Sequence, residues 1–426
     1  MSEFFKDMSI WGILTEISFY FLLILYIWGG SCKFGRRGEI NEDYTSLETM
    51  KSLRGFAAIG VILHHISQEE IFQKKGELSM FVNAGAYFVA IFFFCSGYGL
   101  LKSFDNKKDY LKGFVRKRIV KAIVLPFYVN VLIYGLGHLI AGPKMTADHW
   151  ICNLTGLTMM NPYAWFPIIL ALLYLVFFLT FRFIKARPVS LGIILLFIFG
   201  LGLAFCYNGH FAWWSGEPNW WLTPEAMNAP WWKNTHTLLL SGEWWVNSAP
   251  AFFTGLIFAN YEKALTEWFR KLYAVKFHIL LAVTMLAFKL SSFGQMKFGY
   301  WTEYMGNGPG TAEKIKTYFC QVPLFLLLGL TIIVFMMKYH VSNPVSRFFG
   351  KYSLHTYLMN LMALELFRFL QTDKTSPFKA GNYDLLIYAF AVFAGSILLG
   401  MAEQHLTGLI QKLLFRDKPK AEVKKA

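Results

Sequence analysis

Long apolar stretches recur along the whole chain, and they limit what it can fold into. Residues 189–207, VSLGIILLFIFGLGLAFCY, contain no charged side chain. A helix needs roughly 20 mostly apolar residues to cross a bilayer. Stretches of about this kind fall at 9–29, 53–69, 82–101, 120–141, 164–181, 189–207, 245–260, 277–293, 319–337, 353–370 and 384–406. We therefore expect an all-α, polytopic membrane helical bundle with about 11 transmembrane helices.

Charged residues are few and unevenly placed. They make up 16% of the chain, whereas soluble proteins contain about a quarter. Most of the 41 lysines and arginines fall in alternate connections, at 30–54, 102–121, 182–188, 261–276, 338–351 and 411–426. Basic residues concentrate on the cytoplasmic side of membrane proteins. The net charge of +15 therefore predicts orientation, with the N-terminus outside and the C-terminus cytoplasmic in the plasma (inner) membrane, and does not indicate a nucleic-acid partner.

The stretches follow one another with short connections, which indicates one integral membrane domain. Residues 1–50 are predicted to form an extra N-terminal transmembrane helix and a cytoplasmic linker, and residues 51–410 a ten-helix membrane domain. Residues 411–426 form a basic cytoplasmic tail too polar to bury an apolar core. No internal repeat favours the inverted-repeat architecture of transporters.

One connection, residues 208–247, is long and rich in tryptophan. It holds four pairs: Trp213-Trp214, Trp220-Trp221, Trp231-Trp232 and Trp244-Trp245. Tryptophan gathers at membrane–water interfaces, where its ring is apolar and its N–H stays wet. The alternative is a platform on which a sugar or lipid headgroup stacks. Both interpretations stay open from the sequence.

Three ionisable residues in the stretch around 53–69 stand out, because such groups are costly inside a bilayer and are often functional. Arg54 and His65 are eleven positions apart, close to three helical turns, so they share one face about 16 Å apart along the axis. His64 points roughly 100° away. We expect this face to line a passage, with His65 as the working histidine and His64 as its packing or tautomer-fixing neighbour.

The basic run KSFDNKKDYLKGFVRKRIVK, residues 102–121, precedes the next apolar stretch. Ordinary topology determination accounts for about half of its charges. Arg116, Arg118 and Lys121 lie near a helix start, where a fork of donors binds phosphate well. They are candidates for an anionic cytoplasmic ligand such as a nucleotide-bearing thioester. Ser96, within FFFCSGYG, has no nucleophile elbow around it, and with its glycine neighbour it indicates close helix packing.

Together these motifs resemble the membrane-bound acyltransferase-3 family. That family has an Arg, ten residues and a His in its first core helix, matched by Arg54 and His65. Its FFxxSG[FY] motif in the next helix is matched by Phe92, Phe93, Ser96, Gly97 and Tyr98. Its Arg-x-x-Arg run before a proline is matched by Arg118, with Lys121 in place of the second arginine and with Pro126 slightly late.

A fourth motif of the family, G-K-x-S-x-x-x-Y-L-x-H, lies near the C-terminus. GKYSLHTYLMN matches it at Gly350, Lys351, Ser353, Tyr357 and Leu358. Asn360 stands where the family has histidine. The resemblance covers roughly residues 50–400, and the order and spacing of the motifs make it more specific than any one of them.

The resemblance implies an integral membrane acyltransferase that moves an acyl group, most often acetyl, from acetyl-CoA to a hydroxyl of a carbohydrate or another cell-envelope molecule. His65 would act as general base or accept the acyl group transiently, with Arg54 beside it. Arg116, Arg118 and Lys121 would bind the CoA phosphates, and His64, Ser96, Tyr98, Ser353, Tyr357 and Asn360 would support the site. We expect acyl-CoA as co-substrate, no tightly bound cofactor and no metal. A transporter or flippase for a lipid-linked glycan or organic anion is the alternative.

Overall fold

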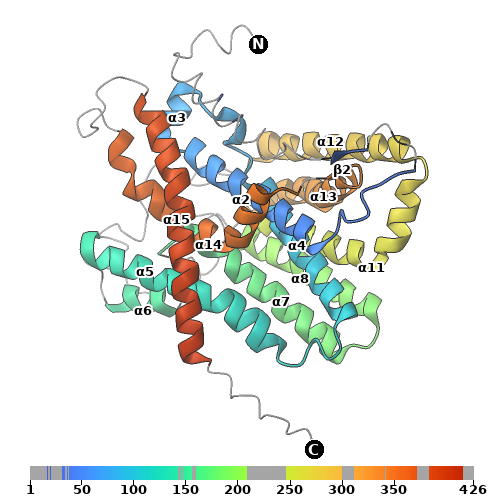
Figure 1. Cartoon of the computed structure of the whole chain (residues 1–426), viewed down its shortest axis with the longest axis horizontal. Helices are drawn as coiled ribbons and strands as arrows, with labels where there is room; N and C mark the ends of the chain where they lie inside the picture. The colour runs from blue at the N-terminus through green and yellow to red at the C-terminus, as the bar shows by residue number, and fades with distance from the viewer. Residues whose placement is uncertain are drawn as a thin grey trace, which may run out of the picture.

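The computed structural model of the protein describes residues 31–33, 36, 38–142, 145, 147–155, 160–208, 246–299, 311–340, 342–371 and 383–415, together with residues 17 and 20. Long helices dominate this part of the chain (Figure 1): α2 (Leu47–Ser67), α4 (Gly85–Asn106), α5 (Leu125–Ala141), α7 (Trp165–Phe183), α8 (Arg187–Asn208), α11 (Pro250–Arg270), α12 (Tyr273–Phe298), α13 (Thr311–Met336), α14 (Pro344–Leu366) and α15 (Tyr383–Leu414).

Shorter elements connect these helices. They are α3 (Glu70–Lys75), η1 (Ser79–Phe81), the π-helical segment η2 (Val115–Val124), α6 (Ala147–Thr155), η3 (Pro162–Ala164), η6 (Val246–Ser248) and η8 (Arg368–Gln371). Strand β1 (Ser31–Cys32) pairs antiparallel with β2 (Tyr339–His340). The expected all-α membrane bundle is therefore confirmed, with this small two-stranded sheet beside it.

Seven helical segments of the described chain are long and apolar enough to cross a membrane: α4, η2 with α5, α7, α8, α12, α13 and α15. Three further predicted stretches, at 53–69, 245–260 and 353–370, do form helices (α2, α11 and α14), but these are less apolar. The stretch 9–29 lies outside the described residues except for 17 and 20, as does most of the tryptophan-rich connection 208–247. The protein is a multi-pass membrane protein, and the total of about 11 spans stays a prediction.

Helix α2 is less apolar because it lies at the centre of the protein. Every residue from Ala57 to Ser67 is buried. One of its faces packs in the large core with Ala57 and Val61, while Ile62 and Ile66 pack in a second core with residues of α14 and α15. A helix enclosed by protein on all sides need not present apolar side chains to lipid, so it can carry polar groups.

Helices α2 and α14 form a close parallel pair. Their hydrogen bonds follow the same order along both, from Ser52–Ser342 near the start of α2 to His65–Asn360 towards its end. Glycines allow the close approach: a Cβ on Gly350 would lie 1.9 Å from the backbone oxygen of Lys51. Small residues are the usual means by which membrane helices approach so closely.

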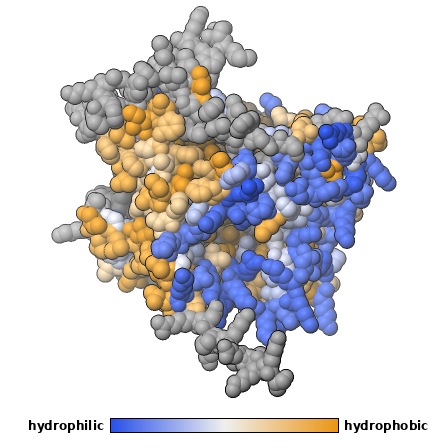
Figure 2. Space-filling view, in the orientation of Figure 1, coloured by the Kyte–Doolittle hydropathy of each residue, from blue (hydrophilic) through white to orange (hydrophobic). Residues whose placement is uncertain are grey.

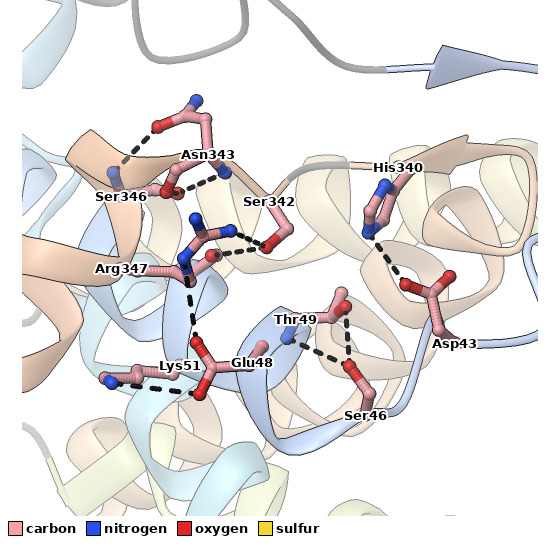
Figure 3. A network of polar contacts seen from close by, with 11 residues as sticks. Asp43, Ser46, Glu48, Thr49, Lys51, His340, Ser342, Asn343, Ser346 and Arg347 are labelled. Carbon is pink, nitrogen blue, oxygen red and sulfur yellow. Dashed lines mark hydrogen bonds and ion pairs between the residues drawn. The ribbon is translucent and has the colours of Figure 1, made fainter.

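A polar network fixes the common start of this pair (Figure 3). Ser46 caps α2 by accepting from the Thr49 backbone N–H, and Asn343 caps α14 through a reciprocal capping box. Arg347 on α14 connects the two helices, donating to Ser342 and pairing with Glu48 on α2. We call this end of the bundle, where α2 and α14 begin and α4 and α11 end, the basic end. The distal end is where α2 ends and α4 begins.

The face of the protein seen in Figure 2 has an apolar part and a polar part. In Figure 2 hydrophobic side chains cover the left of the view, where Figure 1 places α5 and α15. Hydrophilic side chains gather at the right, over the side where α11 lies. A continuous apolar surface of this kind suits contact with lipid acyl chains.

Candidate functional site

His65 lies inside the protein near the end of α2, and 7% of its surface is exposed. Its ring stacks on that of Tyr163 in η3, with an interplanar angle of 6° and centroids 3.8 Å apart. The ring of Tyr357 on α14 lies 6.5 Å away. The His65 Nδ1 atom hydrogen-bonds Asn360 Oδ1. The imidazole therefore faces neighbouring helices and not lipid.

A chain of hydrogen bonds determines which ring nitrogen carries the proton. Ser396 on α15 donates its hydroxyl to the backbone oxygen of Val392, 2.7 Å away, so its oxygen is an acceptor for the Asn360 amide nitrogen at 2.8 Å. Asn360 must then present its oxygen to His65, and only an Nδ1–H can donate to it. The neutral ring consequently has its lone pair on Nε2, which hydrogen-bonds no other described residue.

His64 occupies a different environment from His65, although the two ring centroids are 5.2 Å apart. Its Nδ1 lies 2.8 Å from the backbone oxygen of Phe81. Its Nε2 packs against Gly85, where an added Cβ would lie only 2.3 Å from it. Both edges of His64 are thus occupied by backbone, which fits the packing role expected for it.

Two asparagines hold in place the segments that pack against His65, which are η3 and the part of α14 around Leu358. Asn161 accepts from the Tyr163 backbone N–H at 3.1 Å and donates to the Leu358 backbone oxygen at 2.7 Å. Asn130 on α5 donates to the same oxygen at 3.1 Å. Because Asn161 fastens both η3 and α14, it fixes the Tyr163 ring against His65. Sequence reasoning missed Tyr163, Asn161 and Asn130, whose residue types carry no motif.

Arg54 lies three turns before His65, at the basic end, and its side chain is half-buried. The half-buried Tyr174 on α7 interacts electrostatically with both Arg54 on α2 and Arg118 on η2. The passage expected between Arg54 and His65 stays a prediction.

The three predicted phosphate-binding residues divide between two sides of η2. Arg116 and Lys121 both lie over the ring of Phe415, at 5.5 and 4.9 Å from its centroid. They share a side because the i→i+5 bonding of a π-helix places residues five apart nearly above one another. Arg118 instead lies 5.5 Å over the ring of Tyr110. Burial raises the pKa of the Tyr110 phenol, and the Arg118 guanidinium opposes that shift.

The FFxxSG[FY] motif contributes helix contacts. The Tyr98 hydroxyl donates to both carboxylate oxygens of Glu262 on α11, each at 3.1 Å. A Cβ on Gly97 would lie 2.1 Å from the Phe252 backbone oxygen of the same helix, which agrees with the packing interpretation. Ser96, half-buried beside Gly97, is not brought to His65 by any contact among the described residues.

Only some residues of the C-terminal motif, G-K-x-S-x-x-x-Y-L-x-H, lie near His65. Tyr357 and Asn360 lie beside His65, whereas Ser353, two turns earlier on α14, donates to the Gly350 backbone oxygen at 3.3 Å. Only the last turn of the motif therefore belongs to the surroundings of the imidazole.

A second buried polar pair was missed by sequence reasoning. His355 Nδ1 on α14 lies 3.2 Å from Glu403 Oε2 on α15, and both residues are buried. Glu403 falls inside the apolar stretch 384–406, and a carboxylate at that depth is the signal that could have identified it. The pair joins α14 to α15 between the basic end of the bundle and Asn360.

Comparison with known proteins gives one finding. Residues 48–402 match the family model of an acyltransferase domain, that of acyltransferase-3. Neither the curated proteins nor the solved structures gave a match. The matched range contains α2 through most of α15, and so includes His65, Asn360 and Ser396.

Proposed function

Because the chain belongs to the acyltransferase-3 family and is an acyltransferase, we propose that it transfers an acyl group, acetyl in the first instance, from a CoA thioester to a hydroxyl group. The acceptor is a carbohydrate or another cell-envelope molecule. The proposal rests on the family, on the buried imidazole of His65 and on the basic end of the bundle. The modification is then an O-acylation at the membrane.

The observation that carries the proposal is the hydrogen-bond chain from Ser396 through Asn360 to His65. It leaves the Nε2 lone pair of a neutral ring available. In direct transfer, Nε2 takes the proton of the acceptor hydroxyl as the oxygen attacks the thioester carbon. The C–S bond then breaks, and the imidazolium returns the proton to the CoA thiolate.

An acyl-histidine relay uses the same nitrogen. Nε2 attacks the thioester carbon, the C–S bond breaks, and CoA leaves as the thiolate, which gives an acyl-imidazolium. The acceptor hydroxyl then attacks the acyl carbon, the bond from that carbon to Nε2 breaks to restore the neutral imidazole, and the hydroxyl proton passes to the CoA thiolate. Both routes need Nδ1–H held by Asn360 and Nε2 unprotonated. His65 is therefore the residue on which either route depends.

The donor would bind at the basic end. Arg54 and Arg118 both interact electrostatically with Tyr174, and Arg116 and Lys121 both lie over one ring. Guanidinium groups are well suited to phosphate. The rise of about 16 Å from Arg54 to His65 is comparable to the extended arm of CoA between its phosphates and its sulfur. With the basic end cytoplasmic, donor would arrive from the cytoplasm.

The test compares two histidine variants in protein purified in detergent. An asparagine amide nitrogen can replace Nδ1 of histidine but leaves nothing in place of Nε2. His65→Asn should therefore keep the contact with Asn360 and still lower the rate of acyl transfer by at least about 100-fold. His64→Asn keeps a donor for the Phe81 oxygen and should cost far less.

The measurement is release of free CoA thiol from labelled acetyl-CoA, together with label transferred to a panel of methyl glycosides. His405→Asn, at an exposed histidine of α15, is the control and should be unchanged. A transporter would leave the thioester intact. Full activity of His65→Asn, or a reversed order of His64 and His65 variants, would refute the assignment.

A further inference from the structure

A cavity of about 200 Å³ opens at the distal end of the bundle. It lies between the end of α2, the start of α4, η6, α12 and α13. Gln68 forms part of its wall and follows His65 by three residues, a rise of about 4.5 Å along the helix. The cavity is smaller than the roughly 300–1,000 Å³ of pockets for drug-sized ligands, which favours a ligand of about one ring.

Amide side chains dominate the wall of this cavity, which we call the amide cavity. They come from six different elements or connections: Gln68, Gln73, Asn83, Asn247, Gln295 and Gln321. None of the described residues that line it is an Asp, Glu, Lys, Arg or His. Amides both donate and accept hydrogen bonds, so the wall suits a neutral ligand with several hydroxyl groups and not a phosphate or carboxylate.

Asn247 gives the amide cavity an acceptor that is not satisfied by the described residues. Only 2% of its surface is exposed. Its Nδ2 donates to Gln321 Oε1 at 2.9 Å, and its Oδ1 has no hydrogen-bond partner in the described part of the chain. A buried carbonyl oxygen without a donor is unfavourable, and a ligand hydroxyl would remove that cost.

Two aromatic rings complete the wall. Tyr87 and Phe325 both line the amide cavity, and their centroids lie 6.1 Å apart. Aromatic faces carry partial negative charge and attract the C–H groups that a sugar ring presents on one of its sides. The amides can therefore hydrogen-bond the hydroxyl groups at the edge of a pyranose ring, and the two aromatic rings can pack against its C–H face.

We propose that the amide cavity binds one neutral, polyhydroxylated ring of the acceptor, a pyranose sugar unit next to the hydroxyl that is acylated. This inference rests on the proposed function, because it assigns the acceptor side of the same site. It places the sugar one helical turn beyond His65, at the end of α2 opposite Arg54. Donor and acceptor would thus approach the imidazole from opposite ends of one helix.

The first experiment measures binding without donor. Whole protein in lipid nanodiscs is titrated with methyl β-D-glucopyranoside and methyl β-D-galactopyranoside, and saturation-transfer NMR reports contact with each. Glycerol 3-phosphate offers hydroxyls with charge, and 1-hexanol offers one hydroxyl with an apolar chain. A glycoside should bind in preference to both. No glycoside binding, or equal binding of glycerol 3-phosphate, would overturn the proposal.

The second experiment locates the binding. The double variant Asn247→Leu, Gln321→Met replaces both partners of one hydrogen bond with apolar residues of similar shape. Because neither partner is left unpaired, the loss of folding stability should be small. Glycoside affinity should fall about tenfold. Gln295→Met changes the part of the wall formed by α12 and should weaken binding too. This variant provides the test if the double variant does not fold. Gln411→Met on α15, outside the cavity, should leave binding unchanged. Unaltered binding in the cavity variants would place the sugar elsewhere.

The two proposals fail in different ways. His65→Asn should lower the rate of transfer by at least about 100-fold and retain glycoside binding, because His65 is not part of the amide cavity wall. Binding that is lost in the cavity variants while His65→Asn remains active would refute the role of His65 only, and binding lost in those variants while the protein leaves the thioester intact would refute the proposed function only. Transfer that needs His65 while glycoside binding is absent would refute the amide cavity only.

Discussion

Asn360 connects the imidazole of His65 to the helix beyond it, and its role can be tested separately from that of the ring. Asn360→Leu keeps the branched shape of the side chain but removes the acceptor for Nδ1–H. The proton can then move to Nε2, where it blocks the base. We expect kcat to fall by about tenfold to a hundredfold, with the KM for the acyl donor little changed.

Two further variants make this a test of the hydrogen bond. Asn360→His restores an acceptor, since a neutral histidine has one free ring nitrogen, and it should recover most of the activity. Ser396→Ala acts one bond further away and should cost less than Asn360→Leu. A loss in Asn360→His as large as that in Asn360→Leu would show that position 360 acts through packing alone.

At the residue scale the sequence predicted one side of the site only. Arg54, His65, Tyr357 and Asn360 were predicted because ionisable groups and short motifs are local signals, and of these the structure brings His65, Tyr357 and Asn360 together. Tyr163 and Ser396 were missed because nothing in their own segments distinguishes them. They belong to the site through contacts that join η3, α2 and α15 in space.

At the scale of elements, the α2–α14 contact is the most sensitive part of the fold. A Cβ on Gly350 would lie 1.9 Å from a backbone oxygen of α2, and backbone cannot rotate away as a side chain can. Gly350→Ala should therefore destabilise the protein by about 1–3 kcal/mol. It should also displace Asn360, which lies ten residues further along α14, and so reduce activity.

Thermal inactivation in detergent measures the first effect and turnover of acetyl-CoA the second. Gly99→Ala on α4 is the matched control, because no atom beyond its own helix lies within 4 Å of its added Cβ. That variant should be neutral or slightly stabilised, since alanine favours helix over glycine by about 0.5–1 kcal/mol. Equal stability of the two variants would refute the close contact.

The positions of the helices in the sequence were easier to predict than the way in which the helices pack against one another. Hydropathy is a property of a single segment, and it identified α4, α7, α8, α12, α13 and α15. It could not show that α2 is enclosed by the other helices. Nor could it identify the π-helical winding of η2, which places Lys121 on the side of Arg116 and not on that of Arg118, because that winding depends on packing.

For the whole molecule, orientation is the main prediction left to test. Cys32 is exposed and lies beside β2, which precedes α14 at the basic end. If that end is cytoplasmic, a membrane-impermeant maleimide should label Cys32 in inverted vesicles and not in intact cells. Cys32→Ser shows how much signal comes from other cysteines. Labelling of Cys32 in intact cells would reverse the orientation.

Tyr163 gives the site one more property. A phenol lying parallel to the imidazole at van der Waals distance shields one face of that ring and leaves the other uncovered by it. In the proposed transfer, an acyl group at Nε2 would then be open to the acceptor on the face that Tyr163 leaves free. The bundle would thereby give different roles to the two faces of a planar ring that are alike on their own.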